Sequence, residues 1–128
     1  MKETNEKLTA TAKAAVDKSN TAKKVKSGSL EVFSTPMLLA LMEEATCNAV
    51  KPILEKGETT VGTKVSITHD KASGTGEIIT AHASLEKIDK RRLSFEVYAT
   101  DESGDTIGKG IIERFVVNEE RFMERVNK

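Results

Sequence analysis

The chain has 128 residues, which suits one domain large enough to bury a core without disulfides or metals. Its 20 basic and 20 acidic side chains cancel, which argues against a nucleic-acid-binding protein. No apolar stretch reaches the ~20 residues of a membrane span. The single Cys47 cannot form an internal disulfide, and Met1–Lys7 lacks the apolar block of a signal peptide. We therefore expect one cytoplasmic domain over residues 1–128, with residues 1–7 as a flexible tail.

The first half of the chain predicts one strand and one long helix. Apolar residues alternate through Leu8–Val16, which indicates a strand, and Asp17–Asn20 is typical of a turn. Thr35 precedes a proline and predicts the N-cap of a helix from Met37 to about Leu54. Apolar residues cover so much of the early helix that we expect it to be buried on several sides.

The second half predicts four strands and a short terminal helix, capped by Asn118. Alternating apolar residues place the strands at Thr60–His69, Glu77–Ile88, Leu93–Ala99 and Thr106–Val117. On the first of them, the odd-numbered residues from Val61 to His69 are expected to share one face. Most turns are short, which favours antiparallel neighbours. The fold class is therefore α+β, with an antiparallel sheet wrapped on a long central helix.

Glu43 is the most informative polar residue, because it lies on the apolar stripe of the predicted helix, whereas Glu44 lies on a wetter face. A carboxylate in that position is costly unless it is paired or protonated. It is therefore either a structural carboxylate with a basic or amide partner, or a general base or nucleophile activated by desolvation. His69, at the end of a strand, is either merely partnered or one half of an acid–base pair with a helix glutamate.

Two smaller residues admit both a structural and a functional interpretation. The Thr35 hydroxyl either caps the helix, or positions a water molecule, or acts as a nucleophile. Eight residues separate it from Glu43, or ~12 Å along the helix axis. A substrate must bridge that distance, or a dimer interface must bring the two residues together. Gly62 is either a plain strand glycine or a place where the backbone approaches a substrate oxygen closely.

The remaining polar residues are not assigned to a catalytic role. His82 faces away from the apolar side of its strand and is expected at the surface or an interface. No spacing of histidine and cysteine fits a zinc site, so no metal is expected. A basic cluster, made of Lys87, Lys90, Arg91 and Arg92, suits phosphate contacts as well as a solvated hairpin tip, and we favour the tip.

The order of the elements and six short motifs resemble the hotdog fold, and more narrowly the fluoroacetyl-CoA thioesterase family. The motifs are Glu31-Val32-Phe33-Ser34-Thr35, Leu41-Met42-Glu43, Val61-Gly62-Thr63, Thr68-His69, Lys90-Arg91-Arg92-Leu93-Ser94 and Glu113-Arg114-Phe115-Val116-Val117. They span roughly residues 31–125. The resemblance places the family's catalytic residues on Thr35, Glu43 and His69. It also places a glycine near the thioester on Gly62 and a pocket arginine on Arg114.

This resemblance implies a hotdog dimer, or a dimer of dimers, with its pocket at the subunit interface. It implies hydrolysis of a small or medium acyl-CoA to the free acid and CoA, with no cofactor other than the CoA of the substrate. Lys24–Leu30 holds no aromatic residue, unlike the lid of the fluoroacetyl-specific enzyme, so we expect a different or broader acyl group. The alternatives are a non-hydrolytic acyl-CoA-binding protein, a dehydratase or isomerase with His69 as base, and a structural dimer module.

Overall fold

The computed structural model describes residues 1–128, and its elements follow the predicted order. They are β1 (Thr9–Ala15), α1 (Ala22–Val25), α2 (Thr35–Val50), the 3₁₀ turn η1 (Lys51–Ile53), β2 (Glu58–Ile67), β3 (Ile78–Asp89), β4 (Arg92–Thr100), β5 (Thr106–Asn118) and α3 (Glu119–Val126). The short helix α1, capped by the Thr21 side chain, is not among the elements predicted from the sequence. None of these helices is both long and apolar enough to cross a membrane.

The five strands form one antiparallel sheet in the order β1-β3-β4-β5-β2. Hairpins join β3, β4 and β5, as the short turns predicted. The neighbours of β2 do not follow from turn length, however. The segment 68–77 carries the chain from β2 on one edge to β3 next to β1, so consecutive strands β2 and β3 are not paired.

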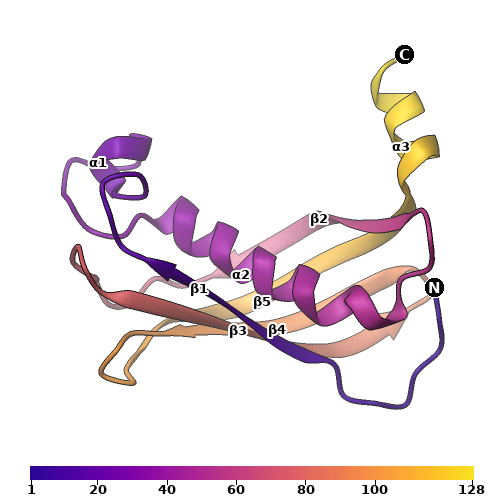
Figure 1. The fold of residues 1–128 in the computed structure, drawn as a ribbon, viewed down its shortest axis with the longest axis horizontal. Helices are drawn as coiled ribbons and strands as arrows, with labels where there is room; N and C mark the ends of the chain where they lie inside the picture. The colour runs from indigo at the N-terminus through magenta and orange to yellow at the C-terminus, as the bar shows by residue number, and fades with distance from the viewer.

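The helix α2 lies across one face of the curved sheet, as expected for the hotdog fold, with α1 beside its first turns and α3 projecting from the other end (Figure 1). Its buried residues are Leu38, Leu41, Met42, Ala45, Thr46, Ala49 and Val50. They pack against the inward side chains of the strands, which include Ile79, Ala81, Phe95, Val97 and Ile112. The prediction that the helix is buried on several sides is not confirmed in the single chain, because these residues lie on one side of α2, and Ala40 and Glu44 on the opposite side are exposed.

The start of α2 differs from the prediction by one residue, and the difference matters for the site. Ser34, not Thr35, is the N-cap, because its hydroxyl accepts a hydrogen bond from the Met37 amide at 3.2 Å. The helix therefore begins at Thr35, and Pro36 occupies its second position. Pro52 ends the helix earlier than predicted, since α2 stops at Val50 and a 3₁₀ turn follows. The hydroxyl of Thr35 is thus not used for capping.

A β-bulge in β2 overturns the prediction that its odd-numbered residues share one face. The register between β2 and β5 shifts between Gly62 and Lys64. Val61 pairs with Phe115, which is exposed on the outer face, whereas Val65 pairs with the fully buried Ile112. An extra residue in one strand exchanges the two faces beyond it. The strand also ends at Ile67, so His69 lies two residues past it.

Met1–Lys7 holds no helix or strand, but its ends contact the domain. The Lys2 amide donates to the Ile53 carbonyl at 2.7 Å, and the Met1 amine lies 2.7 Å from Glu58. Lys7 forms an ion pair with Glu86 at 2.6 Å. Both ends of this segment therefore contact the domain, and its expected flexibility stays a prediction.

Candidate active site

Thr35 and His69 meet at the first turn of α2. The Thr35 Oγ1 atom lies 2.8 Å from His69 Nδ1. Because Ser34 supplies the helix cap, the Thr35 hydroxyl is free for this contact, and it is exposed to solvent. The two residues line a small pocket between the segment 22–33 and the segment 69–72. A hydroxyl in hydrogen-bond contact with an imidazole is an arrangement that can activate a nucleophile.

The imidazole of His69 is partly buried, and its environment favours the neutral base. Burial lowers the pKa of His69, and the negative charge of Asp70 opposes that effect. The second ring nitrogen, Nε2, is buried without a hydrogen-bond partner. No carboxylate orients the ring from that side. Thr35 is therefore the only polar partner of this imidazole.

Glu43 lies farther along α2 and is paired with Arg114 rather than with His69. Its Oε2 atom accepts a hydrogen bond from Arg114 Nη1 at 3.0 Å. The guanidinium is buried, and its Nε and Nη2 atoms donate to the hydroxyl and the carbonyl of Thr60 at 2.8 and 3.1 Å. Arg114 therefore anchors Glu43 to the inner face of the sheet through a charge-assisted hydrogen bond.

Gly62 makes room for that carboxylate. A Cβ atom at position 62 would lie 2.7 Å from Glu43 Oε2, closer than real contacts allow. The residue sits at the β-bulge, is exposed, and pairs with Arg114 across β2 and β5. The Glu43 side chain is 35% exposed, so the carboxylate rests over an open strand edge and not in a sealed core. The glycine thus permits a close approach of the Glu43 carboxylate, and its expected place near a substrate oxygen stays a prediction.

The predicted site residues thus form two groups on the same side of the molecule. Thr35 and His69 make one, and Glu43, Gly62 and Arg114 make the other. The expected contact between Glu43 and His69 is absent, since each carries a different partner. Two helical turns, or ~12 Å of helix axis, separate the two groups.

The amides at the start of α2 leave few free donors for an oxyanion. The Met37 amide donates to the Ser34 hydroxyl and the Leu38 amide to the Ser34 carbonyl. Pro36 has no N–H. Only the Thr35 amide has no acceptor within the chain, which leaves one free donor in the first turn.

The residues left outside the site behave as predicted. His82 lies on the outer face and stacks on Tyr98, with ring centroids 4.4 Å apart. In the basic cluster, Arg91 bonds the Val116 carbonyl at 3.0 Å and the Glu58 carboxylate at 2.7 Å. The hydrogen bond from the Met1 amine contributes most to lowering the pKa of Glu58 to about 2, and Arg91 adds to it. The cluster is thus a hairpin tip with a structural arginine.

Ser34 and Thr60 hold Thr35 and Arg114 in place, and neither role was predicted from the sequence. Ser34 precedes a threonine that also fits a cap, and only the bond to the Met37 amide tells them apart. Thr60 faces inward among apolar residues and is 8% exposed. A polar residue at an inward strand position could have indicated a buried partner, but nothing in the sequence identifies that partner as Arg114.

Comparisons with known proteins point to one family. A profile of the fluoroacetyl-CoA-specific thioesterase family, FlK, matches residues 16–120. The fluoroacetyl-CoA thioesterase of Streptantibioticus cattleyicolor is 41% identical over 98 residues, which cover 77% of this chain and 70% of that protein.

Solved structures of fluoroacetyl-CoA thioesterases have a similar fold over almost the whole chain. A structure of the fluoroacetyl-CoA thioesterase FlK superimposes with a TM-score of 0.90 at 33% identity, covering 98% of this chain and 96% of that one. A variant of the same enzyme in complex with fluoroacetate and CoA gives a TM-score of 0.85 at 34% identity, with 91% and 95% coverage.

Proposed function

The chain belongs to the fluoroacetyl-CoA-specific thioesterase family and is an acyl-CoA thioesterase, and we propose that it hydrolyses small or medium acyl-CoA esters through Thr35, His69 and Glu43. The observation that carries the proposal is the 2.8 Å contact between Thr35 Oγ1 and His69 Nδ1. It pairs a hydroxyl with a base whose pKa is lowered by burial. The neutral imidazole is the form that accepts a proton.

In the proposed reaction, the Thr35 oxygen attacks the thioester carbon while its proton passes to His69. The C–S bond then breaks, CoA leaves as the thiol with that proton, and water hydrolyses the acyl-threonine to the free acid. The Thr35 amide is placed to stabilise the oxyanion. Glu43, held by Arg114 above Gly62, is a base for the water step.

Glu43 and the Thr35–His69 pair are separated by ~12 Å and do not reach one reaction centre within a single chain. We propose that a second copy of the chain pairs with the exposed edge of β2 and completes the site between the two groups. Val65 belongs to the helix-side face of that strand and is still 43% exposed, and Gly62 beside it is open as well. A second copy on this edge would cover the Glu43 group. A homodimer, or a dimer of dimers, is the assembly that this supports.

The phosphates of CoA have a candidate site at the α1 end of the molecule. An open groove there is lined by Lys18, Lys23 and Lys24, with Glu31 as the only acidic residue. None of these lysines forms an ion pair. The same α1 segment borders the pocket of Thr35 and His69. The basic hairpin with Arg91 instead lies beside Glu58, at the end of β2 remote from His69.

The test is the release of free thiol from a panel of acyl-CoA esters from acetyl to octanoyl. Turnover of at least one ester by the wild type, with loss in Thr35→Val and His69→Gln, is the expected result. Folded wild-type protein that binds these esters without releasing thiol would refute the proposal. The Lys23→Glu and Lys24→Glu variants should raise KM for acyl-CoA but not for the matching acyl-pantetheine, which lacks the nucleotide phosphates. The location in the cytoplasm stays a prediction.

A further inference from the structure

The ring of His69 has few hydrogen-bond partners, so its position depends mainly on how the backbone around it is held. The residue lies in the segment that follows β2, outside the strand ladder. Thr35 contacts Nδ1, and Nε2 has no partner. Ring orientation therefore depends on how firmly the residues on either side of His69 are held. Those residues are Thr68 and Asp70.

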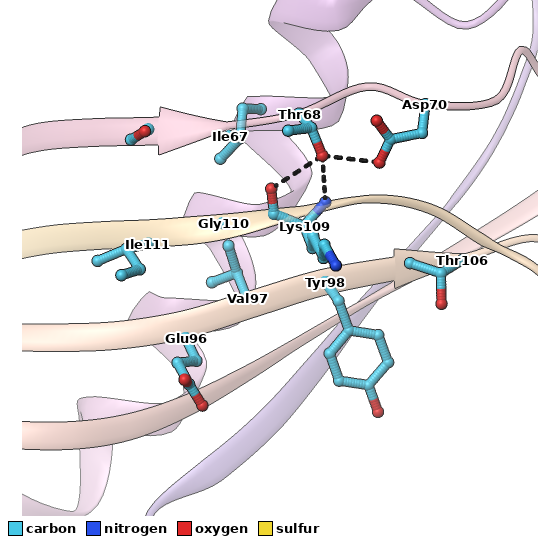
Figure 2. Close-up of a pocket in the computed structure, with 11 residues that line it drawn as sticks. Ile67, Thr68, Asp70, Glu96, Val97, Tyr98, Thr106, Lys109, Gly110 and Ile111 are labelled. Atoms are coloured by element: carbon cyan, nitrogen blue, oxygen red, sulfur yellow. Dashed lines mark hydrogen bonds between the residues drawn. The ribbon is translucent and has the colours of Figure 1, made fainter.

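Thr68 and Asp70 tie this segment to β5 from both sides of His69. The Thr68 hydroxyl donates to Asp70 Oδ2 at 2.7 Å and accepts from the Lys109 amide at 3.3 Å. The Thr68 amide donates to the Lys109 carbonyl at 2.8 Å, and the Asp70 amide to the Ile107 carbonyl at 2.7 Å. Figure 2 shows Thr68 between Asp70 and Lys109, at the edge of a hollow on the outer face.

The close packing of this segment requires a glycine on β5. A Cβ atom at Gly108 would overlap the Thr68 carbonyl oxygen and would lie 3.1 Å from the Leu38 side chain. Lys71, the next residue after Asp70, is held between Asp101 and Asp105 at 2.6 and 2.7 Å. The segment 68–71 is thus fixed to the start of β5 and to the β4–β5 hairpin.

Asp70 also supplies the negative charge nearest to His69. The pocket that His69 faces is lined from α1 and from the segment 27–33 by uncharged residues, and from α2 by Thr35. Its charged members are Asp70 and Lys71, and two aspartates neutralise Lys71. Asp70 favours the imidazolium against burial, which disfavours it.

We propose that Thr68 and Asp70 form a clamp that positions His69 and stabilises the imidazolium formed when it accepts a proton. No group orients the ring of His69 or supplies a negative charge at Nε2. In the proposed clamp, the two neighbours of His69 in the chain take over both tasks. Both residues are positioning residues, since neither contacts the Thr35–His69 pair directly. The proposal rests on the proposed function for its catalytic consequence, but its physical part can be measured without turnover.

The first experiment is an NMR titration of His69. The chain has two histidines, so a His82→Gln background leaves one imidazole signal. In that background Asp70→Asn keeps a hydrogen-bond acceptor for Thr68 and removes the charge. We expect it to lower the pKa of His69 by about half a pH unit, a small effect because Asp70 is exposed. An unchanged titration midpoint would overturn the electrostatic role.

The second experiment is kinetic. Thr68→Val keeps the shape of the side chain and removes the hydroxyl's bonds to Asp70 and to the Lys109 amide, so kcat should fall about 10-fold with little change in KM, and Thr68→Ser should restore it. Asp70→Asn should move the acidic limb of the kcat/KM profile to lower pH, because the neutral base persists there. Ser66→Ala, in the same hollow, is the control.

A Thr68→Val enzyme within twofold of wild type, folded by circular dichroism, would overturn the positioning role. A wild type that hydrolyses no thioester would refute the proposed function and leave the titration result standing.

Discussion

At the scale of single residues, the site depends on which partner each polar side chain has. Glu43 and Glu44 are neighbours on α2, but only Glu43 reaches across to a buried arginine, and Glu44 is exposed. The sequence predicted which of the two turns inward, because the helical stripe separates them. It could not predict that Arg114 takes the place expected for His69, since that contact joins residues 71 positions apart.

Glu43→Gln is expected to preserve the fold and to reduce kcat about 100-fold, the usual effect of losing an acid–base group. The amide keeps the shape of the side chain, and Arg114 keeps both of its bonds to Thr60. Steady-state thiol release measures the loss, and thermal unfolding measures the fold. Glu44→Gln is the matched control and should leave both unchanged. Equal activity in the two variants would remove Glu43 from the mechanism.

Gly62→Ala tests whether the close approach of the carboxylate matters. The added methyl would displace Glu43 Oε2, and the backbone at this position does not require a glycine. We therefore expect a lower kcat with a nearly unchanged melting temperature. At Gly74 a Cβ atom meets nothing within 4 Å, so Gly74→Ala is the control. If Gly62→Ala is as active as Gly74→Ala, the Glu43 carboxylate does not need its place above the bulge.

At the scale of elements, the sequence predicted every strand and both longer helices, but not how β2 is joined to the sheet. Alternation of apolar residues reports burial within one strand. It carries no signal for the bulge at Gly62, which exchanges the faces of Val61 and Val65, and none for the pairing of β2 with β5. Both depend on contacts between distant segments. The glycines at 108 and 110 are the only local hint, since β2 and its continuation approach β5 closely there.

Two adjacent hydroxyls at the start of α2 have different expected roles, one in stability and the other in activity. Ser34→Ala removes the N-cap and should lower the free energy of unfolding by about 1 kcal/mol. Thr35→Ala removes no cap bond and should leave stability nearly unchanged while abolishing turnover. Urea unfolding and thiol release on the same preparations distinguish the two effects. The reverse pattern would show that Thr35 is the capping residue and has no catalytic part.

At the scale of the whole molecule, the position of the site is the argument for the proposed homodimer. The Glu43 group lies against β2, which is an edge of the sheet and ten residues long. Long, open edge strands are normally covered or paired in natural proteins. The Thr35–His69 group lies at the end of the same strand. In the proposed dimer, a partner on this edge would enclose both groups within one interface.

Val65→Lys places a charge on the uncovered inner face of β2 and is expected to shift the wild-type dimer to monomer in analytical ultracentrifugation. Turnover should fall with dissociation and recover as protein concentration rises, because the second copy completes the site. Ile111→Lys puts the same charge on the exposed outer face, where it can break a dimer of dimers but not the β2 pairing. A wild type that is monomeric and fully active at micromolar concentration would contradict the shared site, and Glu43 would then have to act within its own chain.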